Sequence, residues 1–91
     1  MNITEEILLE NGFKKTYNLL DDLEYKIRVS MKGNEDYLFT ITLDNLCSNY
    51  PKREWNIQID DARMCSVCGC DIQTTEHFNT LMDLMEIDFR L

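Results

Sequence analysis

The amino-acid sequence predicts an α+β fold: an antiparallel sheet of three to five strands, with an N-terminal and a C-terminal helix packed on one face. Three segments in the middle of the chain alternate between apolar and polar residues, as strands with one buried face do. Segments near both ends instead carry apolar residues at helical spacing. The order helix, strands, helix favours a single sheet covered on one side.

The first element is expected to be a short helix within residues 4–13. Thr4 can accept a hydrogen bond from the free amides of the first turn, and Glu5 and Glu6 suit the positive end of the helix dipole. Gly12 tolerates the left-handed conformation that often ends a helix. The apolar residues expected to lie on the sheet are Ile7, Leu8 and Phe13.

The clearest strand covers residues 25–32, where the alternation has no error. Gly33 and Asn34 tolerate positive φ, and the alternation resumes over residues 37–43, so this region is predicted to be a β-hairpin. The turn could extend beyond two residues, because the acidic residues at 35 and 36 suit a loop as well as a strand.

A third main strand is predicted over residues 55–60, with Trp55 in the core. A fourth strand can be drawn over residues 64–73, through most of the cysteines. A short edge strand is expected within residues 16–20, before the first clear strand.

The chain ends with an amphipathic helix, predicted over residues 74–86 with a threonine cap. Its apolar side is formed by Phe78, Leu81, Met82 and Met85. The opposite side carries an acidic stripe of Glu76, Asp83 and Glu86, which we interpret first as a solvated face and, alternatively, as a surface for a partner.

Composition narrows the classes of function. The 91 residues suffice for a single domain, and 17 acidic against 9 basic residues give a net charge of −8. Such a chain repels phosphate backbones, so nucleic acid is not an expected partner. The basic residues Lys26, Arg28 and Lys32 are expected to form a small solvated face. No apolar run is long enough to span a bilayer and the start of the sequence lacks a signal-peptide pattern, so we expect a cytoplasmic protein.

Cys65, Cys68 and Cys70 lie within six positions, in the stretch CSVCGC. A Cys-x-x-Cys pair suits tetrahedral zinc, and Cys47 or His77 could be the fourth ligand. In a regular strand, however, Cys68 and Cys70 would share a face with Ile72 and Cys65 would point to the other side. We therefore favour cysteines that are small apolar residues of a strand, and keep a zinc-binding module as the alternative.

The sequence contains no phosphate-binding loop, nucleophile elbow or paired metal-binding carboxylates, so an enzyme is not expected. The opening helix, with Thr4-Glu5-Glu6 at its start and Asn11-Gly12-Phe13 at its end, resembles that of short uncharacterised proteins of Bacteroidota phages and mobile elements. The resemblance extends to the hairpin, the strand that begins at Trp55 and the closing helix. It implies a phage or mobile-element origin and supplies no activity.

From these features the sequence predicts a small acidic interaction protein that binds another protein, as an accessory or host-modulating factor. The process in which it acts, the partner's identity and the oligomeric state are left open by the sequence.

Overall fold

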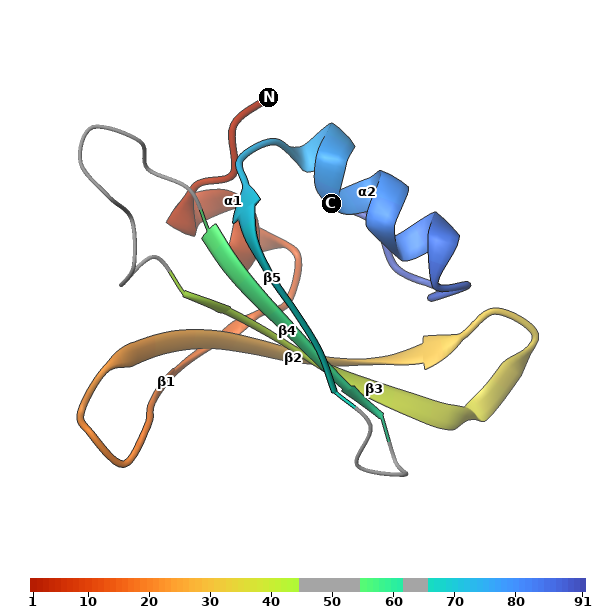
Figure 1. Cartoon of the computed structure of the whole chain (residues 1–91), viewed down its shortest axis with the longest axis horizontal. Coiled ribbons are helices and arrows are strands. Elements are labelled where there is room, and N and C mark those ends of the chain that lie inside the picture. Colours follow the sequence, from red (N-terminus) through yellow and green to blue (C-terminus); the bar gives the residue numbers. More distant parts are fainter. Residues whose placement is uncertain (45–54, 62–65) are drawn as a thin grey trace.

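The structure, a computed structural model, describes residues 1–44, 55–61 and 66–91, with residues 66–71 described by their backbone. Within these ranges the chain forms seven elements in order: α1 (Glu5–Glu10), β1 (Lys14–Tyr17), β2 (Leu23–Met31), β3 (Asn34–Asp44), β4 (Trp55–Asp61), β5 (Ser66–Ile72) and α2 (Thr75–Leu84). The strands form one sheet in the order β1-β2-β3-β4-β5, and all neighbours are antiparallel. Both helices lie on the same side of this sheet (Figure 1), so the predicted α+β fold is confirmed.

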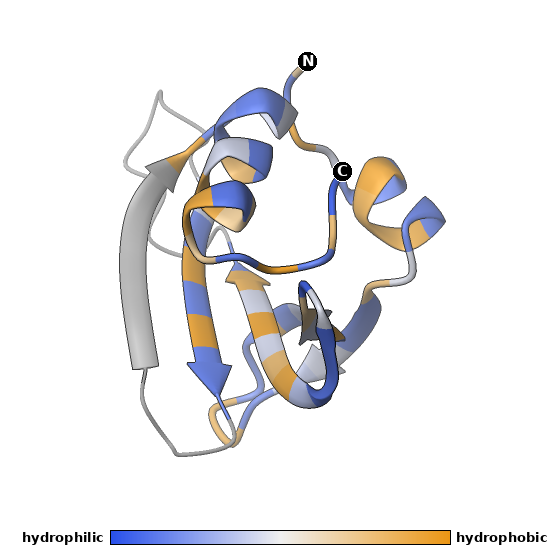
Figure 2. Cartoon of the chain, turned by 90° about the vertical axis from the view of Figure 1, so that its right-hand side faces the viewer, coloured by the Kyte–Doolittle hydropathy of each residue, from blue (hydrophilic) through white to orange (hydrophobic). Residues whose placement is uncertain are grey.

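The alternating segments put their apolar residues on the face that the helices cover. Antiparallel register aligns these residues across β2, β3 and β4, in rows such as Tyr25, Leu43, Ile57 and Ile27, Ile41, Ile59. Most of them are buried, while the intervening positions are polar, which gives the banded strands in Figure 2. The sheet therefore has an inner face that forms the core and an outer face that no described helix covers.

Local signals fix helix α1 as the sequence predicts. The Thr4 hydroxyl accepts a hydrogen bond from the amide of Ile7 at 3.2 Å, which caps the first turn. Gly12 follows the helix with φ +98°, the left-handed conformation that turns the chain towards β1. Leu8 is fully buried against the core and Phe13 nearly so, and these two residues hold the short helix on the sheet.

Helix α2 begins as predicted and ends earlier. The Thr74 hydroxyl accepts a hydrogen bond from the amide of His77 at 3.1 Å, and Phe78 and Met82 are fully buried. The helix stops at Leu84, two residues short of the predicted end, because Glu86 adopts a positive φ of 57°. That turn sends the last residues back over the sheet.

Two backbone bridges hold α2 at its two ends. Before the helix, Ile3 donates to the carbonyl of Gln73 at 2.9 Å and Thr75 donates to the carbonyl of Met1 at 2.8 Å. After the helix, Ile87 pairs with Met31 of β2 in an isolated antiparallel bridge. The first and last residues of the chain are thereby joined to the same helix and sheet.

Three phenylalanines connect the two helices and the C-terminal segment. Phe13, Phe78 and Phe89 meet edge to face, with ring centroids 5.8 to 6.4 Å apart. Edge-to-face aromatic pairs are stabilised beyond the burial of their surface. This cluster, which we call the aromatic trio, closes the core above the sheet.

The predicted edge strand at residues 16–20 is correct only in part. The strand runs over Lys14–Tyr17, and the residues after it form a turn. Asn18 is the reason, because its side-chain oxygen accepts from the amides of Leu20 and Asp22, which bends the chain before the strand can continue.

The regular alternation considered for residues 64–73 is interrupted in β5. The register pairs Cys68 with Gln58 of the outer face, whereas Ile72 pairs with the inward-facing Trp55. A register shift between these pairs adds one residue on β5. One extra residue exchanges the two faces of a strand, which interrupts the alternation.

The burial of Phe78 generates a test of the fold. Phe78→Ala should lower the free energy of unfolding by about 4 kcal/mol, because it removes a fully buried ring and leaves a cavity. Urea denaturation measures this loss. Leu84→Ala, on the exposed side of the same helix, is the control and should change stability by less than about 0.5 kcal/mol. Similar losses in the two variants would contradict the described packing.

Candidate functional site

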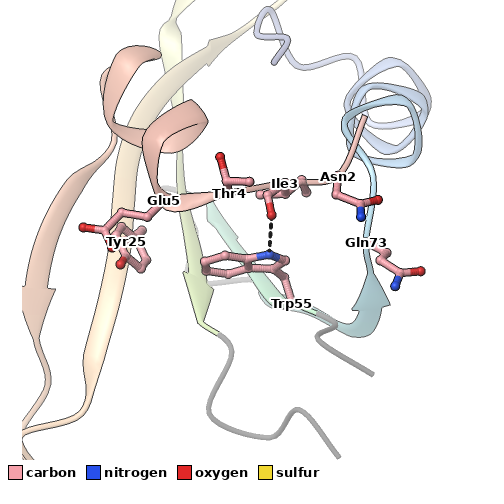
Figure 3. Close-up of a pocket in the computed structure, with 7 residues that line it drawn as sticks. All are labelled: Asn2, Ile3, Thr4, Glu5, Tyr25, Trp55 and Gln73. Atoms are coloured by element: carbon pink, nitrogen blue, oxygen red, sulfur yellow. Dashed lines mark hydrogen bonds between the residues drawn. The ribbon is translucent and has the colours of Figure 1, made fainter. Parts of the chain in front are cut away.

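A pocket of about 370 Å³ lies between the N-terminal segment, β2 and β4 (Figure 3). Its lining residues are Asn2, Ile3, Thr4, Glu5, Tyr25, Trp55 and Gln73. The rings of Tyr25 and Trp55 meet edge to face at 5.6 Å. The indole nitrogen of Trp55 donates to the carbonyl of Ile3 at 3.2 Å, the bond drawn in Figure 3.

Several polar groups around this pocket are already engaged within the chain. The Glu5 carboxylate is ion-paired with Lys15, and this hydrogen bond lowers the pKa of Glu5 below its ordinary value. Burial raises the pKa of the Tyr25 phenol, and the neighbouring Glu5 carboxylate adds to the effect. Thr4 caps α1. The rings of Tyr25 and Trp55 are themselves nearly buried, so the exposed side chains left around the pocket are those of Asn2 and Gln73.

A more unusual feature is the turn between β1 and β2. Leu19 is fully exposed, Leu20 is 81 % exposed and Tyr17 is 68 % exposed. These residues, which we call the apolar tip, lie at the end of a hairpin that projects away from both helices, at the lower left of Figure 1. Single exposed leucines are common, but two adjacent ones beside an exposed tyrosine form a patch.

The turn that carries the apolar tip is built from polar groups. Besides the two bonds to the side chain of Asn18, the amide of Asn18 donates to the carbonyl of Asp22 and the amide of Asp21 donates to the carbonyl of Asn18, both at 3.0 Å. Asp21 adopts a left-handed φ of 61°, which aspartate tolerates better than most residues. These hydrogen bonds hold the turn, so the leucine side chains are not needed to form it and stay exposed to solvent.

The residues predicted to bind zinc are only partly described. Cys47 and Cys65 lie outside the described residues, and Cys68 and Cys70 are placed in β5 by their backbone alone. His77 lies exposed in the first turn of α2. Among the residues that the structure describes, no three histidine, cysteine or acidic side chains gather where a metal ion could bind. The zinc site stays a prediction.

The acidic stripe on α2 is paired within the chain at two of its three positions. Glu76 accepts a hydrogen bond from the N-terminal amine of Met1 at 2.8 Å. Asp83 is bonded to Lys32 at 3.1 Å and to Arg90 at 2.9 Å. Glu86 lies beyond the helix end and is exposed. Much of the expected charge is thus locally balanced, and the role of this stripe in binding stays a prediction.

No protein-family model, curated protein or solved structure matches this chain. No helix in the described ranges combines the length and the apolar character needed to cross a membrane.

The apolar tip escaped the sequence analysis, although a signal for it is present. Leu19 and Leu20 are bounded by Asn18 on one side and by Asp21 and Asp22 on the other. Asparagine and aspartate favour turns because their side chains bond to nearby amides. Leucines between such residues belong to a turn, where they cannot reach the core.

The zinc alternative has a direct test. In native mass spectrometry, protein expressed with zinc available should have the mass of the metal-free chain, because the strands and helices already form a continuous core. Treatment with a strong chelator is the control and should change neither mass nor fold. One zinc ion per chain, lost together with the fold, would contradict this expectation and make the cysteine cluster the organising site.

The contacts of Asp83 predict its titration. Hydrogen bonds from Lys32, together with the charge of Arg90, lower the pKa of Asp83 below its ordinary 3.8, since they favour the carboxylate. Its contribution to stability is present above the unfolded pKa and is lost as pH falls through the lower folded pKa. Carbon-detected NMR should show this low pKa, and Lys32→Gln with Arg90→Gln should return it towards 3.8. An unchanged value in that variant would refute the assignment.

Proposed function

We propose that this chain is a small, acidic, non-enzymatic protein-binding module that inserts its apolar tip into an apolar pocket of another protein. The observation that carries the proposal is the exposure of Leu19, Leu20 and Tyr17 together on one projecting turn. The resemblance of the opening helix supports the further proposal that the protein is an accessory or host-modulating factor of a phage or mobile element.

The shape and rigidity of the turn suit this role. A convex apolar projection fits a concave pocket, where a few buried residues supply most of the binding free energy. Because hydrogen bonds of Asn18 already order the turn, little conformational entropy is lost when the leucines are buried. Burial of both leucines contributes about 4 kcal/mol.

A protein partner suits the tip better than a lipid surface. Asp21 and Asp22 directly follow the leucines, and the chain as a whole carries a net charge of −8. Anionic headgroups would repel both, and the two aspartates would meet the bilayer together with the leucines. A protein pocket can accommodate the acidic residues at its solvated rim.

The test is a comparison of two leucine substitutions. Immobilised wild-type protein is used to capture a partner from the natural host, and the affinity for the identified partner is then measured by calorimetry. Leu19→Ser with Leu20→Ser should weaken binding about a hundredfold, since it removes about 3 kcal/mol of apolar burial. The matched control is Leu84→Ser, which changes a leucine that is 77 % exposed on α2 and should bind as wild type does.

Circular dichroism should show that both variants fold, because none of these leucines belongs to the core. Equal affinity of the wild type and the Leu19, Leu20 variant would overturn the proposal. A wild-type dimer that dissociates in this variant would also overturn it, because the occupant of the tip would then be a second copy of the chain.

A further inference from the structure

The basic residues of the described ranges divide into two equal groups. Lys15, Lys32 and Arg90 each form an ion pair with a carboxylate of the chain. The other three, Lys14, Lys26 and Arg28, are exposed, and no described carboxylate lies within ion-pair distance of them. On a chain of net charge −8, cations without an ion pair to a described carboxylate are unexpected.

These three cations share one face of the sheet. Lys14 of β1 pairs directly with Lys26 of β2, and Arg28 follows two residues further along the same strand. Neighbouring positions on a strand face opposite ways, and Lys15 accordingly reaches Glu5 of α1 on the inner side. Lys14, Lys26 and Arg28 therefore form a basic row on the outer face, which no described helix covers.

The nearest carboxylate in register is that of Glu24, which precedes Lys26 by two residues on the same face of β2, and it forms no ion pair with the basic row. Thr42 is the register partner of Lys26 on β3, and Thr40 is the partner of Arg28, so threonines separate the cations from the acidic residues of β3 and β4. Asp44 accepts a hydrogen bond from Asn56, and Asp60 accepts one from Gln58. Lysines that lie directly opposite each other repel, and no described carboxylate forms an ion pair with either of the two.

Lys32, which the sequence analysis grouped with Lys26 and Arg28, does not belong to this row. A register shift after Ser30 interrupts the alternation of β2, and the Lys32 ammonium reaches Asp83 of α2. Lys14 is the third cation of the row in place of Lys32. The position of Lys14 beside Lys26 follows only from the pairing of β1 with β2.

The basic row and the apolar tip lie on the same hairpin. Tyr17 faces the inner side of β1 with Lys15, so the tip residues that a partner on the outer side can take up are Leu19 and Leu20 of the turn. A protein that takes these leucines into a pocket from the outer side brings its neighbouring surface over the row. We propose that this neighbouring surface is an acidic segment, whose carboxylates pair with Lys14, Lys26 and Arg28; the inference rests on the proposed function.

The spacing of the cations suits a protein segment with several carboxylates. Lys14 and Lys26 are about 5 Å apart across the strands, and Arg28 is about 7 Å further along, so adjacent acidic side chains can reach them together. Screening at physiological salt limits interactions to about 8 Å, so a short segment interacts mainly with the row. A nucleic acid, with its long run of phosphates, also meets the negative field of the remaining chain.

The probe for this inference is a decaglutamate peptide, titrated into the full chain at low salt and followed by amide NMR. We expect shifts at the amides of β1 and β2 around the row. Lys26→Gln with Arg28→Gln should weaken peptide binding about fivefold, because it removes two exposed charge pairs. Lys32→Gln with Arg90→Gln removes the same charge from cations that are already paired, and is the matched control that should retain binding.

The absence of amide shifts, or equal weakening of peptide binding in both double variants, would overturn the proposal that the basic row binds an acidic segment. Tighter binding of a ten-nucleotide single-stranded DNA than of the peptide would overturn it as well, since the preferred partner would then be a nucleic acid. The Leu19→Ser, Leu20→Ser variant should bind decaglutamate as wild type does, because this probe has no apolar group. If wild-type protein binds its partner through the apolar tip but does not bind decaglutamate, the proposal for the basic row is refuted and the proposed function is not.

Discussion

The contact on which the rest of the fold depends is the edge-to-face packing of Phe13, Phe78 and Phe89. Helix α1 has six residues, too few to be stable by itself, and α2 has ten. Both need a tertiary surface, and the aromatic trio joins them to each other and to the C-terminal segment above the sheet. The backbone bridges at the two ends of α2 then fix where that helix lies.

The parts of the fold that the sequence predicts correctly are those determined by neighbouring residues. Strict alternation identifies β2, β3 and β4, because a strand with one buried face must repeat every second residue. Thr4 and Thr74 identify the starts of the helices, since each hydroxyl bonds to an amide three residues later. The outer face of the sheet follows from the same alternation, although the apolar Leu38 lies on it and is exposed.

The parts that the sequence does not predict depend on residues far apart in the chain. The register shift between β4 and β5 requires knowledge of both strands, and it reverses the faces within the cysteine region. Asp83 and Lys32 are 51 residues apart in the sequence. Helical spacing therefore predicted the acidic stripe but could not predict the lysine that pairs with it. The basic row was predicted only in part for a related reason: Lys26 and Arg28 were expected on one face, but Lys14 joins them only through the pairing of β1 with β2.

The core and the proposed binding surface occupy different parts of this molecule, and that separation supports the proposed function. The core lies between the helices and the inner face, and none of Leu19, Leu20 or Tyr17 contributes to it. Backbone groups and Asn18 form the turn, so polar residues in place of Leu19 and Leu20 would allow the chain to fold equally well. Exposed leucines there increase the risk of aggregation without adding stability. A surface that folding does not explain, on the same hairpin as cations that form no ion pair with a described carboxylate, supports the proposal of a protein partner.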